Sequence, residues 1–493
     1  MTINHGIRIK INNSQYPVSP IIAILLTIIQ IVFLIWLFLS WHYDDPFITY
    51  RYASNLINGM GFVYNPGERV LSTTTPLFTF LLAGLGYIWS DIPKIATIIG
   101  CISSGISGLI FWDLARQWKM DIASWVGLLL IPTFPLIVIT ISSETPLYIA
   151  LVLATLDCYV RCHYRWAAIF ASLLILVRPD GVLLPLIIVI YFLFGKKRPI
   201  PWIALGIFII ITGLWFGFSW LYFGSPLPIT LMTKQHQGVM SISQLFAPGL
   251  LRIAGSYTHQ WNYVIEALIA LIGAGFILVR RHPIFILVFW TLTYFLAYTI
   301  LGVTRYFWYY APLVPGFIAL VGAGFQWIYE LLTRIHWHRF INIHLERFLY
   351  ISLVILWIYQ GIDLSNISKT PDSRYFIYRS IGEWLNNNTD KYDRIGALEI
   401  GIIGYYAKNP IVDFAGLIQP NVAKQMHADS TYEDTARWAI MTYKPSYIVL
   451  NPLGFPTLMK DLVNKQCQIA QYFRKEDYNT NQNMVIYRCQ GNT

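Results

Sequence analysis

The chain has 493 residues, of which 56% are hydrophobic and only 12% are charged. A soluble domain carries about 25% charged residues, so this composition excludes a soluble globular protein and indicates an integral membrane protein. We expect it to be a multi-pass protein of the plasma (inner) membrane. The net charge is +10. The basic residues are scattered through short loops between apolar segments, which excludes a nucleic-acid groove and makes the loops a signal of membrane topology.

The first apolar run, residues 21–40, is long enough to span a bilayer, which requires about 20 residues. No small-residue cleavage site follows it, so we interpret it as a retained helix and not as a signal peptide. Arg8 and Lys10 precede the run and place the N-terminus in the cytoplasm. Asp44 and Asp45 are therefore expected to emerge on the outer face.

The later apolar segments predict ten further spanning helices. They fall at about 94–113, 122–140, 144–161, 166–178, 181–195, 199–222, 261–279, 284–301, 307–330 and 348–362. Residues 76–90 are apolar but short, and we count them as a half-membrane or interfacial helix. With this count every basic loop is cytoplasmic, namely Arg116/Lys119, Arg161/Arg165, Lys196–Arg198, Arg280/Arg281 and Arg334/Arg339. The prediction is eleven transmembrane helices with the C-terminus outside.

Two of these segments, 166–178 and 181–195, are short and meet at Arg178-Pro179-Asp180-Gly181. Membrane proteins build paired half-helices with charge at the junction around a site, because the non-helical backbone there must be satisfied by protein, water or ligand. We therefore expect this junction to belong to a functional site.

From about residue 363 the composition becomes that of a soluble protein. We predict a membrane module over 1–362, with a first outer loop at 41–93, and an extracytoplasmic α/β domain over 363–493. A helix capped by Asp372 or Ser373 and four strand-like runs support this domain. The runs are 394–399, 411–414, 447–450 and 484–488.

Two smaller features of this domain are open to more than one interpretation. Gly401-Ile402-Ile403-Gly404 follows a strand, but the rest of a dinucleotide fingerprint is missing, so a tight turn is the preferred interpretation. Cys467 and Cys489 flank an expected hairpin, and a disulfide between them is plausible if the domain is outside the cytoplasm.

This topology brings the unusual ionisable residues to the outer face. They are Asp44, Asp45, Arg51, Glu68, Arg69, Glu144, Arg178, Asp180, Lys234, His236 and Arg305. The adjacent acids Asp44 and Asp45 could cap a helix or pair with Arg51. They could also supply a general base with a raised pKa, or hold a divalent cation through oxygen ligands.

The cations also have two interpretations. Arg178 and Arg305 suit a phosphate, since a guanidinium fork matches its geometry, although Arg178 could instead pair with Asp180 and Arg305 lies in an aromatic cluster typical of a membrane interface. Lys234 is a further external cation or an ordinary surface lysine. Glu144 begins a helix, where an acid also compensates the helix dipole.

Several stretches resemble GT-C glycosyltransferases, most closely the branch of cell-wall enzymes that use polyprenyl-phosphate-arabinofuranose. The most specific are Asp44-Asp45-Pro46-Phe47 and the segment from Asn58 to Val70, which contains Asn65-Pro66-Gly67-Glu68-Arg69. Shorter stretches recur in the same order. These are Ser143–Leu147, Arg178–Gly181, Phe223–Pro228, Arg305–Phe307 and Val412–Leu417.

The resemblance implies a polytopic α-helical GT-C fold and an inverting transfer. The donor would be a sugar on a polyprenyl phosphate, and the acceptor a hydroxyl of an envelope glycan, lipid or protein. The implied base is Asp44, with Asp45 as a helper or metal ligand. The implied donor-phosphate residues are Arg178, Lys234 and Arg305. The implied substrate-binding residues are Arg51, Glu68, Glu144 and Asp180.

One segment departs from the arabinosyl branch. Leu71-Ser72-Thr73-Thr74-Thr75-Pro76 stands where those enzymes carry Glu-Gly-Tyr-Thr-Asn, so arabinofuranose should not be assumed. Two rival functions also stay open. A transporter could use the Asp44/Asp45 and Arg178/Asp180 charges as an ion or proton relay, and a non-catalytic envelope protein could bind glycan through its tail domain.

Overall fold

The computed structural model of the protein describes residues 18–194, 199–334 and 339–489. Arg8, Lys10 and the basic loop 196–198, on which part of the predicted topology depends, lie outside these ranges. The side chains of Arg334 and Arg339 are likewise not described. The direction in which the chain crosses the membrane therefore stays a prediction.

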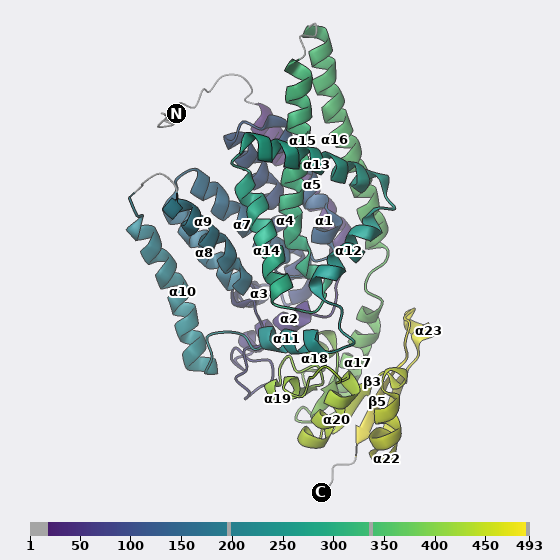
Figure 1. Cartoon of the computed structure of the whole chain (residues 1–493). Helices are drawn as coiled ribbons and strands as arrows, with labels where there is room; N and C mark the ends of the chain where they lie inside the picture. Colours follow the sequence, from purple (N-terminus) through teal and green to yellow (C-terminus); the bar gives the residue numbers. More distant parts are fainter. Residues whose placement is uncertain (1–17, 195–198, 335–338, 490–493) are drawn as a thin grey trace.

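Each of the eleven apolar segments predicted to span the membrane corresponds to a helix, and together they form a bundle (Figure 1). The helices are α1 (Val18–Phe38), α4 (Ile92–Gln117), α5 (Asp121–Thr133), α7 (Thr145–Val160), α8 (Tyr164–Val177), α9 (Leu183–Phe194), α10 (Trp202–Phe223), α13 (Trp261–Arg280), α14 (Phe285–Ile300), α15 (Val314–Arg334) and α16 (Arg339–Ser368). Among the described residues, six helical segments are long and apolar enough to cross a membrane.

The ambiguous segment 76–90 forms α3 (Pro76–Gly86), which has 11 residues. At 1.5 Å per residue it is about 16 Å long, roughly half the hydrocarbon thickness of a bilayer. Its length agrees with the expected half-membrane or interfacial helix. The helix packs against α4 and against α2 (Pro46–Ile57), the helix that Asp45 precedes.

Three features of the helices differ from the prediction. The segment 122–140 is interrupted, because Pro132 and Pro135 lack the N–H that a continuous helix needs, and a short helix α6 (Pro135–Val138) follows α5. Residues 224–260 contain two helices that the apolar pattern did not predict, α11 (Thr230–Val239) and α12 (Phe246–Tyr257). Helix α16 continues to Ser368, so the expected domain boundary at 363 lies inside a helix.

The tail contains a five-stranded sheet in the order β2-β1-β3-β5-β4. The strands are β1 (Ile395–Ala397), β2 (Ile411–Asp413), β3 (Tyr447–Leu450), β4 (Cys467–Phe473) and β5 (Met484–Cys489). The first three are parallel, and β5 is antiparallel to β3 and β4. Four strands fall on the predicted runs. The run that became β4 was missed because it mixes polar and apolar residues, as an edge strand allows.

Helices surround this sheet. The longer ones are α17 (Arg374–Asn388), α18 (Ile402–Ala407) and α20 (Tyr432–Tyr443); the short ones are α19 (Pro420–Ala423), α21 (Pro456–Leu458), α22 (Asn464–Gln466) and α23 (Lys475–Tyr478). The Asp372 carboxylate accepts a hydrogen bond from the Arg374 backbone N–H at the start of α17, as the sequence predicted. The Gly401–Gly404 stretch leads directly into α18 instead of forming only a turn.

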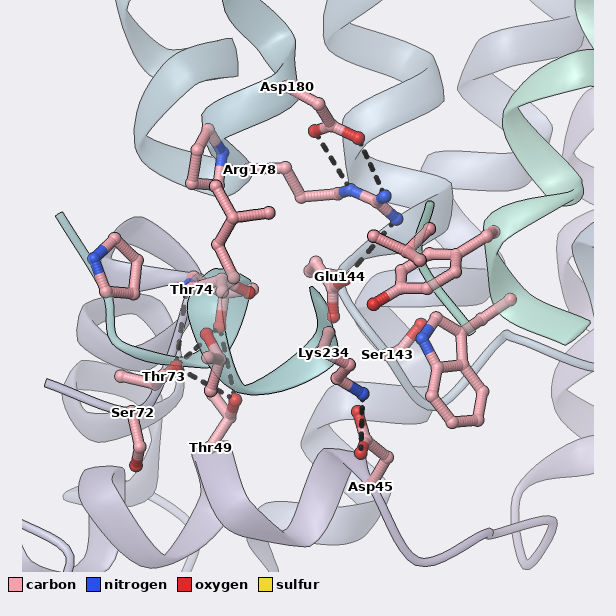
Figure 2. Close-up of a pocket in the computed structure, with 18 of the residues that line it drawn as sticks. Asp45, Thr49, Ser72, Thr73, Thr74, Ser143, Glu144, Arg178, Asp180 and Lys234 are labelled. Carbon is pink, nitrogen blue, oxygen red and sulfur yellow. Dashed lines mark hydrogen bonds and ion pairs between the residues drawn. The ribbon is translucent and has the colours of Figure 1, made fainter. Parts of the chain in front are cut away.

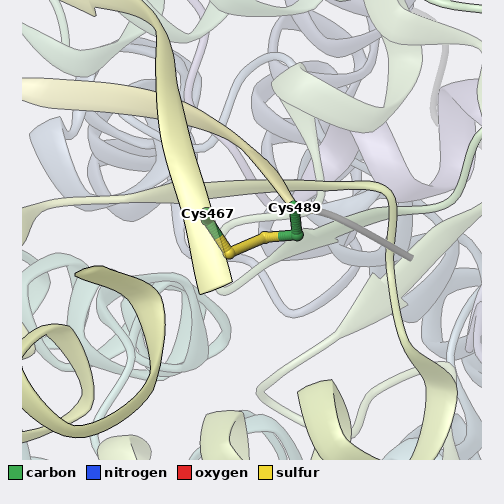
Figure 3. The surroundings of a disulfide bond; sticks show 2 residues. All are labelled: Cys467 and Cys489. Carbon is green, nitrogen blue, oxygen red and sulfur yellow. A yellow bond between two sulfur atoms is a disulfide. The ribbon is translucent and has the colours of Figure 1, made fainter. Parts of the chain in front are cut away.

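The two tail cysteines are joined. Cys467 and Cys489 are directly opposite one another on β4 and β5, and they form a disulfide (Figure 3). The structure thus contains the bond that the sequence left open. It ties the edge strand of the sheet to its neighbour.

The tail domain lies at one end of the bundle, and α2, α11 and α18 meet where the two parts join (Figure 1). The contact is a shared hydrophobic core. Phe47 and Tyr50 of α2 are completely buried together with Ile381 of α17 and Ile402 of α18. At roughly 2 kcal/mol for each large buried side chain, this core fixes the first loop against the tail domain.

Candidate functional site

A cavity of about 320 Å³ lies beside this junction (Figure 2). Its wall is built from segments far apart in the sequence: the start of α2, residues 72–75, the start of α7, the break between α8 and α9, α11, and residues 297–309. The volume is in the range of sites for small organic ligands. Of the predicted site residues, Asp45, Glu144, Arg178, Asp180 and Lys234 line it.

Arg178 is the most heavily bonded cation of this wall. It ends α8, and the chain turns through a short 3-10 helix, Pro179–Val182, before α9 begins. Its guanidinium donates to both oxygens of Asp180, at 3.2 and 2.8 Å, and to the Tyr298 hydroxyl at 2.8 Å. A Glu144 oxygen lies 3.8 Å away. Two carboxylates thus already neutralise the charge of Arg178. This bonding suits a residue that holds the cavity wall together.

Lys234 and Asp45 form a looser pair across the cavity. The Lys234 Nζ lies 3.9 Å from an Asp45 oxygen, at the limit of an ion pair. The same ammonium lies 3.9 Å from the ring centre of Tyr306, with Trp308 and Tyr309 also close. The rings stabilise the cation without neutralising it. The Lys234 side chain is 10% exposed, whereas that of Asp45 is 39% exposed.

Asp44 faces away from this cavity. Both of its oxygens accept hydrogen bonds from the start of α18, from Gly401 N–H at 3.1 Å and from Ile402 N–H at 2.8 Å. The first N–H groups of a helix bind anions well, so Asp44 connects the first loop to the tail domain. Burial and the nearby Glu399 raise the pKa of Asp44 to about 7, although the two backbone donors oppose this shift.

Arg51 has the same connecting role as Asp44. Its guanidinium donates to the backbone oxygens of Tyr64, Gly404 and Asn409, at 2.9, 2.6 and 2.6 Å. Among the described residues it forms no ion pair with Asp44 or Asp45, so the structure does not contain the salt bridge to Arg51 that the sequence left open as one alternative. Arg51 is 3% exposed and lies outside the cavity wall.

Two other candidates also lie outside the wall. Glu68 accepts a hydrogen bond from Asn65, whose side chain pairs with the backbone of Ile411 on β2. The Arg305 backbone N–H donates to the Gln244 carbonyl, and its side chain lies beside Gly249 on α12. Neither residue is among those that line the cavity. The cation from the 304–310 region is thus absent from the wall, while two aromatic residues of that region, Trp308 and Tyr309, line it.

The structure adds a group of hydroxyls that was not among the predicted site residues. Thr49, Thr73 and Thr75 line the cavity, and their hydroxyls lie 3.0–3.2 Å from one another in a triangle (Figure 2). The sequence signal was the run Ser72–Thr75, which differs from the arabinosyl enzymes at a loop next to the double acid. Only the fold shows that Thr49 of α2 completes the group.

The tail domain reaches the cavity through Leu417. The Asp413 carboxylate holds the preceding loop, accepting hydrogen bonds from the N–H groups of Ala415 at 2.7 Å and Ile418 at 3.1 Å. On the other side of this loop, Thr233 of α11 donates to the Gly416 carbonyl at 3.2 Å. The sequence motif Val412–Leu417 therefore positions a loop that closes one side of the cavity.

One edge of the cavity is apolar and open. Val182, Leu227, Leu231 and Leu301 line it and are each between 38% and 53% exposed at the surface of the chain. Exposed apolar side chains on a helix bundle of this composition face lipid. The cavity therefore combines a charged interior with an edge suited to hydrocarbon.

A cation held jointly by Asp44 and Asp45 does not fit these residues. Asp44 uses both oxygens for backbone N–H groups of α18, and Asp45 faces the ammonium of Lys234. Within the part of the chain that the structure describes, no group of three or more His, Cys, Asp or Glu side chains could hold a metal ion.

Comparisons with known proteins agree with this architecture. The structure is similar to that of ArnT from Cupriavidus metallidurans bound to undecaprenyl phosphate, with a TM-score of 0.62 and 13% identity, over 96% of this chain and 99% of that chain. The apo state of the same protein matches with a TM-score of 0.61 and 12% identity, over 95% of this chain and 98% of that chain.

Sequence comparisons are less informative. Residues 366–487 match a family model described only as a domain of unknown function, DUF8728. No curated protein matches the sequence. The match over nearly the whole length of ArnT shows that this chain is a polytopic α-helical membrane protein with the GT-C fold.

Proposed function

We propose that this protein is a membrane glycosyltransferase that moves a sugar from a polyprenyl-phosphate donor to a hydroxyl of an envelope glycan, lipid or protein. The observation that carries the proposal is the cavity, where the loose Asp45–Lys234 pair lies beside an apolar edge that includes Val182 and Leu231. A lipid-linked phosphate needs such a combination, a cation for its head and apolar surface for its chain. The full-length likeness to ArnT, which was crystallised with undecaprenyl phosphate, supports it.

The base in this proposal is Asp45. Asp44 is bonded through both oxygens to α18, and Glu144 lies beside Arg178, whereas the Asp45 side chain is partly exposed in the cavity. Asp45 takes the proton of the acceptor hydroxyl as the acceptor oxygen bonds to the anomeric carbon. The bond from that carbon to the phosphate oxygen breaks on the opposite side, so the sugar is inverted.

The departing phosphate takes the electron pair and a negative charge. Lys234 is the residue that receives it, because among the described residues its ammonium has one ion-pair partner, Asp45 at 3.9 Å, and otherwise lies beside three aromatic rings. A preorganised cation at a developing charge lowers the barrier. When the phosphate binds Lys234, Asp45 loses its ionic partner and is free to accept a proton. Arg178 holds Glu144 and Asp180 in place and acts as a positioning residue.

The cavity and the tail domain belong on the outer side of the membrane in this proposal. The Cys467–Cys489 disulfide supports this side, because disulfides persist in oxidising compartments. The sugar is not assigned to arabinofuranose, since the Leu71–Pro76 segment departs from that branch. The transporter alternative is not favoured, because the full-length structural neighbours are of an enzyme.

The proposal is tested in two steps with the full chain in lipid vesicles. In the first step, binding of undecaprenyl phosphate is compared with binding of undecaprenol. We expect the phosphate to be bound at least about tenfold more tightly, because it adds a charge-assisted contact to Lys234. In the second step, undecaprenyl phosphates carrying labelled sugars are incubated with envelope extract, and labelled glycan is measured. Equal binding of both lipids, or solute uptake without sugar transfer, contradicts the proposal.

A further inference from the structure

The inference concerns the neutral part of the cavity wall and rests on the proposed function. Two helices face each other there with matching patterns. On α2, Thr49 follows Asp45 by four residues, and on α11, Lys234 follows Thr230 by four residues. Residues four apart share one face of a helix and lie about 6 Å apart along its axis. Each helix therefore presents one charged residue and, one turn away, one threonine.

The two helices lie with their charged residues together at one end and their threonine-bearing turns together at the other. Lys234 lies 3.9 Å from Asp45 at the charged end. At the other end, the Ile229 backbone N–H, just before Thr230, donates to the Leu71 carbonyl at 3.0 Å, beside the segment that carries Thr73. Figure 2 shows the threonine group on one side of the view and the Asp45–Lys234 pair on the other. The slot between the helices thus has a charged end and a hydroxyl end.

The hydroxyl end contains no charge of its own. All the hydrogen bonds of the Thr49, Thr73 and Thr75 hydroxyls run to one another or to backbone groups. In a closed triangle each hydroxyl donates once and accepts once, and Thr73 also accepts the Thr75 backbone N–H, so one lone pair is left for a ligand on Thr49 and one on Thr75. Thr73 and Thr75 are both 3% exposed, so a charged ligand group placed here would lose water without gaining an ion pair.

A second observation shows that this end is incomplete without a ligand. Thr230 lines the cavity and is 7% exposed, yet its hydroxyl has no partner within the described residues. A buried hydroxyl without a partner is costly and calls for an explanation at a native site. A hydroxyl of a bound sugar would supply the missing hydrogen bond.

We infer that the hydroxyl end holds the ring of the transferred sugar, and that this sugar is neutral, with hydroxyls facing Thr49, Thr75 and Thr230. The anomeric carbon then lies at the charged end, between Asp45 and the phosphate on Lys234. The transferred group is a hydroxylated pentose or hexose. An amino sugar or a uronic acid would place its charge where the wall offers only hydroxyls.

The test compares donors that share one lipid and differ in the sugar. Undecaprenyl phosphates carrying arabinofuranose, glucose, mannose or galactose form the neutral set, and those carrying glucosamine or glucuronic acid form the charged set. We expect transfer from a member of the neutral set at a kcat/KM at least tenfold above either charged donor. Equal or better transfer of a charged sugar overturns the inference while the proposed function stands.

Threonine-to-valine variants test which side chains contact the sugar. Thr49→Val and Thr75→Val keep the shape and remove the hydroxyl, and each should lower kcat/KM for the neutral donor about tenfold. Their effect should shrink with a donor that lacks the facing hydroxyl. Thr79→Val is the matched control, because Thr79 is buried on α3 and the one hydrogen bond of its hydroxyl within the described residues goes to the Thr75 carbonyl. If Thr49→Val and Thr75→Val behave like the control, the inference is overturned.

Thr230→Val is the most direct test of the sugar contact. Removing a buried hydroxyl that has no partner should leave the melting temperature unchanged or raise it, while transfer of the neutral sugar falls about tenfold. A loss of both stability and transfer would mean a structural role and would count against the inference. Absence of transfer from every donor, together with equal binding of undecaprenyl phosphate and undecaprenol, removes the proposed function and the inference with it.

Discussion

The first loop has two faces that use similar residues for different purposes. Toward the tail domain, Asp44 and Arg51 are buried, and their side chains are bonded to backbone groups of the α18 region. Toward the cavity, Asp45 is partly exposed, and its ionic partner Lys234 is at 3.9 Å. A charged side chain that is fully hydrogen-bonded to backbone groups holds structural elements together. A charged side chain that still has free donors or acceptors can bind a ligand.

The largest effect on activity should come from replacing the two adjacent acids one at a time. Asp45→Asn removes the proposed base and should lower kcat about a thousandfold, within the range for general bases, with little change in melting temperature. Asp44→Asn should do the reverse, since an amide nitrogen would face a backbone N–H of α18. Transfer rates and thermal unfolding in detergent check both. Full activity of the Asp45→Asn protein would end its assignment as the base.

The second test removes the hydrogen bonds of Arg51 between the first loop and the tail domain. Arg51→Met leaves the Asn409 carbonyl without its side-chain donor and removes one of two donors to the Gly404 carbonyl, and it should cost about 3 kcal/mol of stability. Thermal unfolding of the variant measures this loss. Arg379→Met is a matched control, because Arg379 pairs with Glu383 on the surface of α17 and should cost at most about 1 kcal/mol. Equal losses would contradict the structural role of Arg51.

The third test addresses the cavity face. Lys234→Gln should weaken binding of undecaprenyl phosphate about thirtyfold and leave binding of undecaprenol unchanged, since a charge-assisted hydrogen bond is lost. Titration of the lipid in vesicles measures both affinities. Lys424→Gln, at an exposed lysine of the tail domain, is the control. A similar weakening for both lipids would mean that Lys234 supports the fold and not the phosphate.

The smallest effect concerns pH. The pKa of Asp44 is raised from 3.8 to about 7 in the folded protein, so the folded state binds its proton more tightly than the unfolded state. This contribution to stability is complete below pH 3.8 and is lost as pH rises through 7. The slope is at most about 1.4 kcal/mol per pH unit. Thermal unfolding between pH 4.5 and 8 should show a shallower decline for Asp44→Asn than for the wild type.

The raised pKa of Asp413, also about 7, acts in the same direction and persists in the Asp44→Asn protein. The informative quantity is therefore the difference between the two slopes. Identical slopes would show that Asp44 titrates near its ordinary pKa, as its two backbone donors favour. The proposed function would be unaffected by that result.

The sequence by itself determined the membrane class, the eleven apolar segments that became helices, and four of the five strands. These features depend on local composition and period, because a spanning helix needs about 20 apolar residues and a buried strand a short apolar run. It also pointed to the Arg178–Asp180 junction, where charge interrupts apolar sequence. Helix α11 was missed because its residues are mostly polar and it is stabilised by contacts with the tail domain.

Only the tertiary structure decided which candidates share a cavity. Asp44 and Asp45 are adjacent in sequence, but one caps α18 and the other faces Lys234, since the chain turns into α2 between them. The Thr49, Thr75 and Thr230 side chains are dispersed over about 180 residues and line one cavity, because the Lys234–Asp45 pair and the Ile229–Leu71 hydrogen bond hold α11 beside α2 and the 71–75 segment. Such convergence depends on long-range contacts, which neither composition nor period encodes.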